Sequence, residues 1–245
     1  MKQILSWCIA GFLALAPSAG AAPDGKEDIQ AALKKLAESS YSWKATAISE
    51  SEGKDPQDKG ITEGKLEKGG TALIKTTKVD KVTEAAFKGG KVAVKTADGW
   101  RNAGDFDPNG NAKGKLDKGL VLTQNLQKYQ VPALEAAALL AKTKNVEVYQ
   151  DGFYLSNLSD EGVTAYIEQA TKVGKKPADL MEPKVAVKFW VRDGELVKYQ
   201  TVFEYKKVKG KDKTLVATKE TNTVEIKEIG SAKVELPEDV RKKLE

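Results

Sequence analysis

The clearest hydrophobic pattern in the chain runs from Lys184 to Val208. Its alternate apolar positions are Val185, Val187, Phe189, Val191, Val197, Tyr199, Phe203 and Tyr205. Alternation with a period of two is typical of a β-strand that buries one face. The pair Asp193-Gly194 separates the two runs, and Asp-Gly at such a place favours a tight antiparallel turn. The pattern therefore predicts a long β-hairpin over residues 184–208.

The same alternation recurs along most of the chain in short runs that are separated by turn-forming pairs such as Gly89-Gly90 and Asp98-Gly99. Connections this short join antiparallel neighbours, whereas parallel strands need a crossover of a dozen or more residues. The pattern therefore predicts an antiparallel meander. Its further strands are expected over residues 41–48, 61–68, 71–79, 82–87, 92–96, 100–101, 146–149, 153–155, 214–229 and 233–236.

Hydrophobic residues at three- and four-residue intervals predict helices between these strands. Pro132 suits the first turn of a mostly apolar helix, and Ser159 can cap another. The class predicted is α+β, with helices packed on an antiparallel sheet. Helices are expected over residues 26–39, 120–129, 131–142, 159–169 and from Pro237. Irregular segments are expected over residues 49–59, 103–118 and 172–183.

The N-terminus has the pattern of a secretion signal. A basic residue precedes an apolar run at residues 4–16, and small residues follow up to Ala22. The run is shorter than the roughly 20 residues of a membrane-spanning helix. We expect a signal peptide at residues 1–21, followed by one domain at residues 22–245 that is soluble in the periplasm or elsewhere in a bacterial cell envelope. Lipidation of Cys8 is the alternative, but no pair of small residues precedes that cysteine.

Charge and cysteine content narrow the possible partners. Forty Lys and Arg residues are interleaved with 35 Asp and Glu residues, which gives a net charge of +5 without a concentrated basic face. We therefore expect no nucleic-acid partner. Signal cleavage removes the only cysteine, so the exported chain has no disulfide and folds through its hydrophobic core. We expect a monomer.

The chain contains no histidine, which excludes several kinds of catalytic and metal sites. Ser-His-Asp and Cys-His catalysis and His-ligated zinc are ruled out. Residues 105–111 resemble the start of a calcium loop, but Leu116 stands where the twelfth-position glutamate is required, so a turn-rich loop is favoured. A hydrolase using two carboxylates is a distant alternative, because most acidic residues alternate outward beside lysines. We expect no catalytic residue, metal or cofactor.

Large aromatic residues on the alternating strands are the candidate binding residues. They are Trp43, Phe87, Trp100, Phe153, Phe189, Tyr199, Phe203 and Tyr205. These side chains can fill a core beneath the helices. Alternatively, a strongly curved sheet with loosely packed helices leaves an apolar cavity that they line, as in many ligand pockets. The composition leaves both possibilities open.

The order of elements and several short motifs resemble the LolA/LprG-like (LppX-like) superfamily. The motifs are Tyr-Ser-Trp at residues 41–43, Lys-Gly-Gly-Lys-Val-Ala-Val at 88–94, Asp-Gly-Trp at 98–100 and Ala-Lys-Val-Glu-Leu-Pro at 232–237. The resemblance implies an open antiparallel half-barrel wrapped around inserted helices. It also implies a periplasmic carrier of lipids or acylated proteins, with a membrane-associated donor or acceptor, rather than an enzyme.

One feature departs from that superfamily. Its lipoprotein carrier latches a helical lid with an arginine on an early strand, whereas residues 41–48 here offer Lys44 and no arginine. Lysine lacks the planar fork of arginine, so the same latch is not expected. The function expected is a carrier or binding protein for a lipid or an acylated molecule. The alternative is a non-catalytic structural or interaction module of the cell envelope with a packed core.

Overall fold

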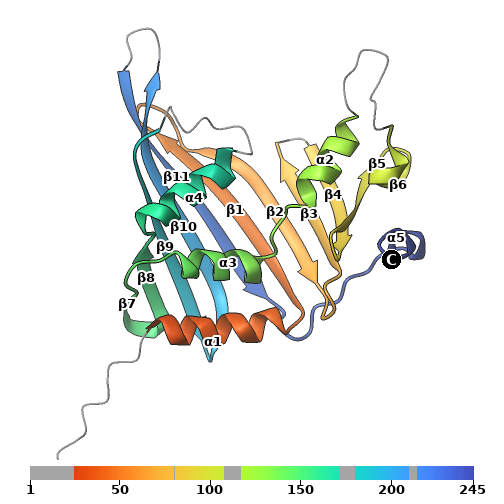
Figure 1. Ribbon diagram of the computed structural model, residues 1–245, viewed down its shortest axis with the longest axis horizontal. Helices are drawn as coiled ribbons and strands as arrows, with labels where there is room; N and C mark the ends of the chain where they lie inside the picture. The colour runs from red at the N-terminus through yellow and green to blue at the C-terminus, as the bar shows by residue number, and fades with distance from the viewer. Residues whose placement is uncertain (1–24, 80, 108–116, 172–179, 210–213) are drawn as a thin grey trace, which may run out of the picture.

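The computed structural model describes residues 25–245 except residue 80 and residues 108–116, 172–179 and 210–213. The signal peptide expected at residues 1–21 lies outside the described residues. Eleven antiparallel strands form an open sheet in the order β6-β5-β4-β3-β2-β1-β11-β10-β9-β8-β7, which curves into a half-barrel (Figure 1). The strands are β1 Tyr41–Ser51, β2 Gln57–Leu66, β3 Ala72–Lys78, β4 Lys81–Lys88, β5 Lys91–Thr96, β6 Gly99–Asn102, β7 Glu147–Val148, β8 Phe153–Asn157, β9 Leu180–Arg192, β10 Glu195–Lys209 and β11 Thr214–Lys227. The predicted α+β class and the open antiparallel half-barrel are confirmed.

The hairpin of β9 and β10 confirms the strongest sequence pattern. Asp193 and Gly194 form its turn with φ angles of 52° and 70°, a region that Gly and Asp tolerate better than most residues. Phe189 lies opposite Tyr199, so both rings are on one face of the sheet. Strand β9 begins at Leu180, inside the expected connector at residues 172–183, whose first part lies outside the described residues.

Two meanders meet at the pairing of β1 with β11. Strands β1 to β6 follow one another outward on one side, and β11 to β7 do so on the other. Trp43 lies opposite Ile226 across this pairing, although 183 positions separate them in the sequence. Long-range pairing therefore holds the two halves of the sheet together.

Two sequence predictions about boundaries are wrong. The expected loop at 49–59 is shorter, because β1 continues to Ser51, which pairs with Thr218 of β11. Polar residues at these solvent-facing strand ends hide the alternation. Residues 233–236 form no strand: the Val234 N–H donates instead to a carboxylate oxygen of Glu67 at 2.9 Å, in extended chain outside the sheet.

Four helices cover the concave face of the sheet. They are α1 Gly25–Ala37, α2 Lys118–Leu126, α3 Pro132–Ala141 and α4 Asp160–Thr171. Apolar residues of all four helices join one core with the inward residues of the strands. Pro132 begins α3 at its first turn, as predicted, and Asp117 caps α2 by accepting from the Gly119 N–H at 2.6 Å. Two single 3₁₀ turns, Ala103–Asp105 and Gln150–Gly152, complete the connections.

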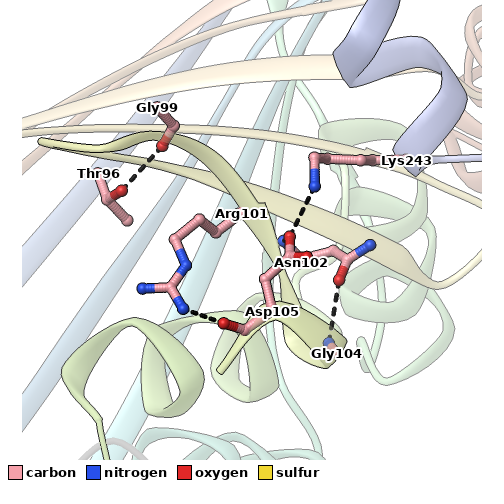
Figure 2. A network of polar contacts seen from close by, with 7 residues as sticks. All are labelled: Thr96, Gly99, Arg101, Asn102, Gly104, Asp105 and Lys243. Atoms are coloured by element: carbon pink, nitrogen blue, oxygen red, sulfur yellow. Dashed lines mark hydrogen bonds and ion pairs between the residues drawn. The ribbon is translucent and has the colours of Figure 1, made fainter. Parts of the chain in front are cut away.

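The C-terminal helix α5, Glu238–Lys243, packs on the opposite, convex face. Its Val240 is fully buried in a small second cluster with Ala86 and Ala93. Lys243 donates to the Asp105 carboxylate at 2.7 Å (Figure 2), and this bond is the main cause that lowers the pKa of Asp105. The C-terminus is thus fastened to the β6 edge of the sheet.

Candidate functional site

Six of the eight predicted aromatic residues face the helices. Five of these are almost completely buried: Trp43, Phe189, Tyr199, Phe203 and Tyr205 have between 0% and 6% of their surface exposed. Phe87 is partly buried and packs against Tyr129 of the α2–α3 connection, with ring centroids 5.6 Å apart. The concave face is therefore largely a packed core, and a ligand pocket would have to lie beside these rings.

The other two predicted residues, Trp100 and Phe153, are on the convex face, so the prediction that all eight share one face is wrong. Trp100 lies opposite Lys95 and packs in the small cluster beneath α5. Phe153 lies opposite Trp190, whose ring centroid is 5.2 Å away. In each short strand the residue next to the aromatic one points inward, and strand pairing rather than aromatic character decides the face.

Trp190 of β9 also lies on the convex face, opposite Phe153. It is half-buried there between Phe153 and Lys198, whose Nζ lies 4.5 Å from the indole centroid. Stacking and a cation–π contact therefore account for its position.

Helices α3 and α4 are tied to the sheet by tyrosine hydroxyls. Tyr199 of β10 donates to Oε2 of Glu135 on α3 at 2.6 Å, and Tyr41 of β1 accepts from the Ala133 N–H at 3.3 Å. Tyr166 of α4 lies 3.5 Å from the Thr201 hydroxyl. Lys44 is exposed on the convex face, so it does not take the place of the arginine latch.

A cavity of about 180 Å³ lies between α3, α4 and the segment that precedes α4. Its lining combines apolar with polar side chains. The polar ones come from helices α3 and α4 and from positions just outside the two ends of α3. The residues that matter for its chemistry are Gln130, Glu135, Leu139, Lys142, Tyr166 and Gln169. The cavity lies beside the buried aromatic rings, since Tyr166 packs edge-on against Phe203.

Glu135 is the unusual group of this site, because it is an acid on the apolar, sheet-facing side of α3. Burial raises the pKa of its carboxyl above 4.5, and the hydrogen bond from Tyr199 opposes part of that rise. The pKa values of Tyr129 and Tyr199 are raised as well. Burial is the largest cause for both, and the charge of Glu135 is the second. These tyrosines therefore remain protonated and act as neutral hydroxyl groups around the carboxylate.

Sequence reasoning missed Glu135. The helix over residues 131–142 was predicted as mostly apolar, and an acid in such a helix is the signal that identifies this residue. A buried carboxylate is costly unless it has a partner or a task.

We expect Glu135→Gln to make the protein more stable at neutral pH. The unfolded carboxyl titrates near 4.5 and the folded one above it, so wild-type stability falls as the pH rises through that interval. Glutamine can still accept the Tyr199 hydrogen bond and carries no charge to bury. Urea unfolding at neutral pH and at about pH 4 should show a stabilisation that shrinks in acid. Glu161→Gln, on the exposed side of α4, should change neither value; a destabilised Glu135→Gln at neutral pH would contradict this reading.

The described residues contain no cluster of three or more acidic groups that could hold a metal ion. Of the calcium-like segment at 105–111, Asp105 is engaged by Lys243 and by the Asn102 N–H (Figure 2). Residues 108–116 lie outside the described residues. In the described part of the chain, no helix has the length and apolarity required to cross a bilayer.

Comparison with known proteins gives matches among solved structures alone. No family model and no curated protein matches the chain. A LolA-superfamily protein from Nitrosomonas europaea is 10% identical over 89% of this chain and 97% of its own, with a TM-score of 0.33. A Vibrio parahaemolyticus domain described as an outer membrane lipoprotein-sorting protein is 9% identical over 88% and 96%, with a TM-score of 0.23. Lipovitellin is 13% identical over 81% of this chain and 26% of its own, with a TM-score of 0.28.

At identities of 9% to 13% and TM-scores of 0.33 or less, these matches say nothing about the ligand or partner of this chain. The functional proposal rests instead on the geometry of this chain.

Proposed function

We propose that the protein is an exported, non-catalytic binding protein that carries a lipid or an acylated molecule between the sheet and helices α3 and α4. The observation that carries this proposal is the cavity between these two helices, where Tyr166 packs against the buried ring of Phe203 on the open half-barrel. A sheet that is covered on one face by separate helices can open there without breaking its own strand pairing. The signal pattern at residues 1–21 supports action in the periplasm, with a membrane-associated donor or acceptor.

The size of the cavity sets a condition on this function. Ligand pockets usually have volumes of about 300–1,000 Å³, and this cavity has about 180 Å³. An acyl chain therefore requires α3 and α4 to move away from the sheet. The hydroxyl bonds of Tyr199, Tyr41 and Tyr166 described above must then break, together with the apolar packing of both helices.

Titration of the mature protein with a fluorescent fatty acid tests the proposal. We expect saturable binding with one probe per chain and a blue-shifted probe emission, because the acyl chain enters an apolar space. A protein that leaves the probe emission unchanged over the whole titration contradicts the carrier function.

The second candidate is a structural or interaction module with a packed core. The burial of five predicted lining residues to 6% exposure or less favours it. In that case α3 and α4 never leave the sheet, and the probe does not bind. A carboxylate-based hydrolase receives less support, because Glu135 is the one acidic residue among the described residues that line the cavity.

A further inference from the structure

The cavity between α3 and α4 contains a carboxylate with unused binding capacity. Oε2 of Glu135 accepts the Tyr199 hydroxyl at 2.6 Å. Among the described residues, Oε1 has no hydrogen-bond donor and Glu135 has no ion pair, yet Oε1 is not one of the fully enclosed unsatisfied atoms. This oxygen therefore remains accessible from the cavity that Glu135 lines.

The surroundings of Glu135 match the chemistry of ammonium recognition. The Tyr199 hydroxyl donates to the carboxylate at 2.6 Å, and Tyr166 lines the cavity together with Glu135. A carboxylate in the same cavity as an electron-rich ring attracts an ammonium ion through charge and through cation–π contact. A cation bound here also offsets the cost of burying the carboxylate.

Lys142 supplies the opposite charge in the same cavity. It follows Glu135 by seven positions, or two helical turns, so the two residues lie on one side of α3 about 10 Å apart along its axis. Within the described part of the chain, the Lys142 ammonium makes no ion pair. The amide side chains of Gln130 and Gln169 complete the polar lining. The cavity thus offers an anionic group and a cationic group to one ligand.

We infer that this cavity binds a zwitterionic group, with its ammonium at Glu135 and its phosphate or carboxylate at Lys142. The volume fits a group of this size, since an engineered cavity of roughly 150 Å³ accepts benzene. The inference deepens the proposed function and rests on it in one respect: in a carrier, the zwitterion is the headgroup of the lipid. A free zwitterion such as aminoethyl phosphate shares the same chemistry.

Calorimetry with three probes tests the inference on the mature protein. The probes are short-chain phosphatidylethanolamine, phosphatidylglycerol with the same acyl chains, and O-phosphoethanolamine. We expect phosphatidylethanolamine to bind about tenfold or more tightly than phosphatidylglycerol, the range that a charge-assisted contact supplies. Glu135→Gln should bring that ratio close to one, whereas Lys142→Met should weaken the binding of both lipids, because both contain the phosphate. Glu161→Gln and Lys128→Met, which change charges on exposed side chains, should leave the ratio unchanged.

Thermal melting of each variant controls for folding, and Glu135→Gln is expected to melt no lower than the wild type. Equal affinities of the wild type for the two lipids, a ratio that survives Glu135→Gln, or affinities that Lys142→Met leaves unchanged would overturn the zwitterion site. Lipid binding in those cases would still uphold the carrier function. Binding of O-phosphoethanolamine that depends on Glu135, without any lipid binding, upholds the site and overturns the carrier. A protein that binds none of the three probes overturns the site.

Discussion

Replacing Phe189 by alanine is expected to lower the free energy of unfolding by about 3–5 kcal/mol. Phe189 is fully buried, lies opposite Tyr199 on the inner face and belongs to the core beneath the helices. Truncation leaves a cavity inside a packed interior, where neighbouring strands cannot close the gap. Urea denaturation followed by far-UV circular dichroism measures the loss. Such a loss identifies this ring as a structural part of the inner wall, next to the ligand cavity rather than freely exposed within it.

Phe153→Ala is the matched control. This ring is half-buried on the convex face, where it stacks on Trp190 and Tyr149 with centroids 5.2 Å away in both cases. Loss of an aromatic pair of this kind costs about 1 kcal/mol. Equal losses for Phe189→Ala and Phe153→Ala would contradict the assignment of the two rings to opposite faces of the sheet.

Gly64→Ala is expected to lower the free energy of unfolding by about 1–3 kcal/mol, the usual cost of overpacking a core. A Cβ atom at Gly64 would lie 2.1 Å from Cζ2 of Trp43, so the indole ring rests directly on this glycine. The ring cannot move aside freely, because it is 3% exposed and packs against Tyr41 at 5.7 Å. Near-UV circular dichroism should show a changed Trp43 signal together with the lower urea midpoint.

Gly104→Ala provides the comparison for Gly64→Ala. The nearest atom to a Cβ there is the Asn102 Oδ1 at 3.4 Å, and Gly104 is exposed. We expect a change within about 0.5 kcal/mol, as for most surface substitutions. If Gly64→Ala is equally neutral, the close contact between Trp43 and β2 does not exist in the protein.

The sequence predicted the local elements well because strands and helices leave different periodicities. The β9–β10 hairpin has strict alternation and an Asp-Gly turn, and both survive in the structure. The helix begun by Pro132 is equally local, since its apolar spacing and its first residue act within one segment. The end of β1 was missed because Ser51 is held by pairing with Thr218, a contact that no neighbouring residue reveals.

The candidate site was predicted only in part, for the same physical reason. Alternation assigned Phe189, Tyr199 and Phe203 to the inner face correctly, because they belong to long strands with many alternating positions. Trp100 and Phe153 belong to short strands, where a difference of one position decides the face and the sequence does not fix it. Glu135 was missed because its role depends on Tyr199, a residue from a distant strand.

A packed inner wall and a cavity are compatible in this molecule. The sheet supplies buried rings, while α3 and α4 cover one part of it, with a cavity between the two helices and three hydroxyl contacts to the sheet. The carboxyl of Glu135 is half-buried and its pKa is raised, so its charge lowers the stability of the folded protein at neutral pH.

Native mass spectrometry of the protein, gently purified from the cell envelope, is the most direct test of the carrier function. We expect a second population, heavier than the mature chain by the mass of one lipid or acylated molecule, which releases that ligand on collisional activation. A single ligand-free mass, from a protein that also fails to bind a fluorescent fatty acid, would contradict the carrier function.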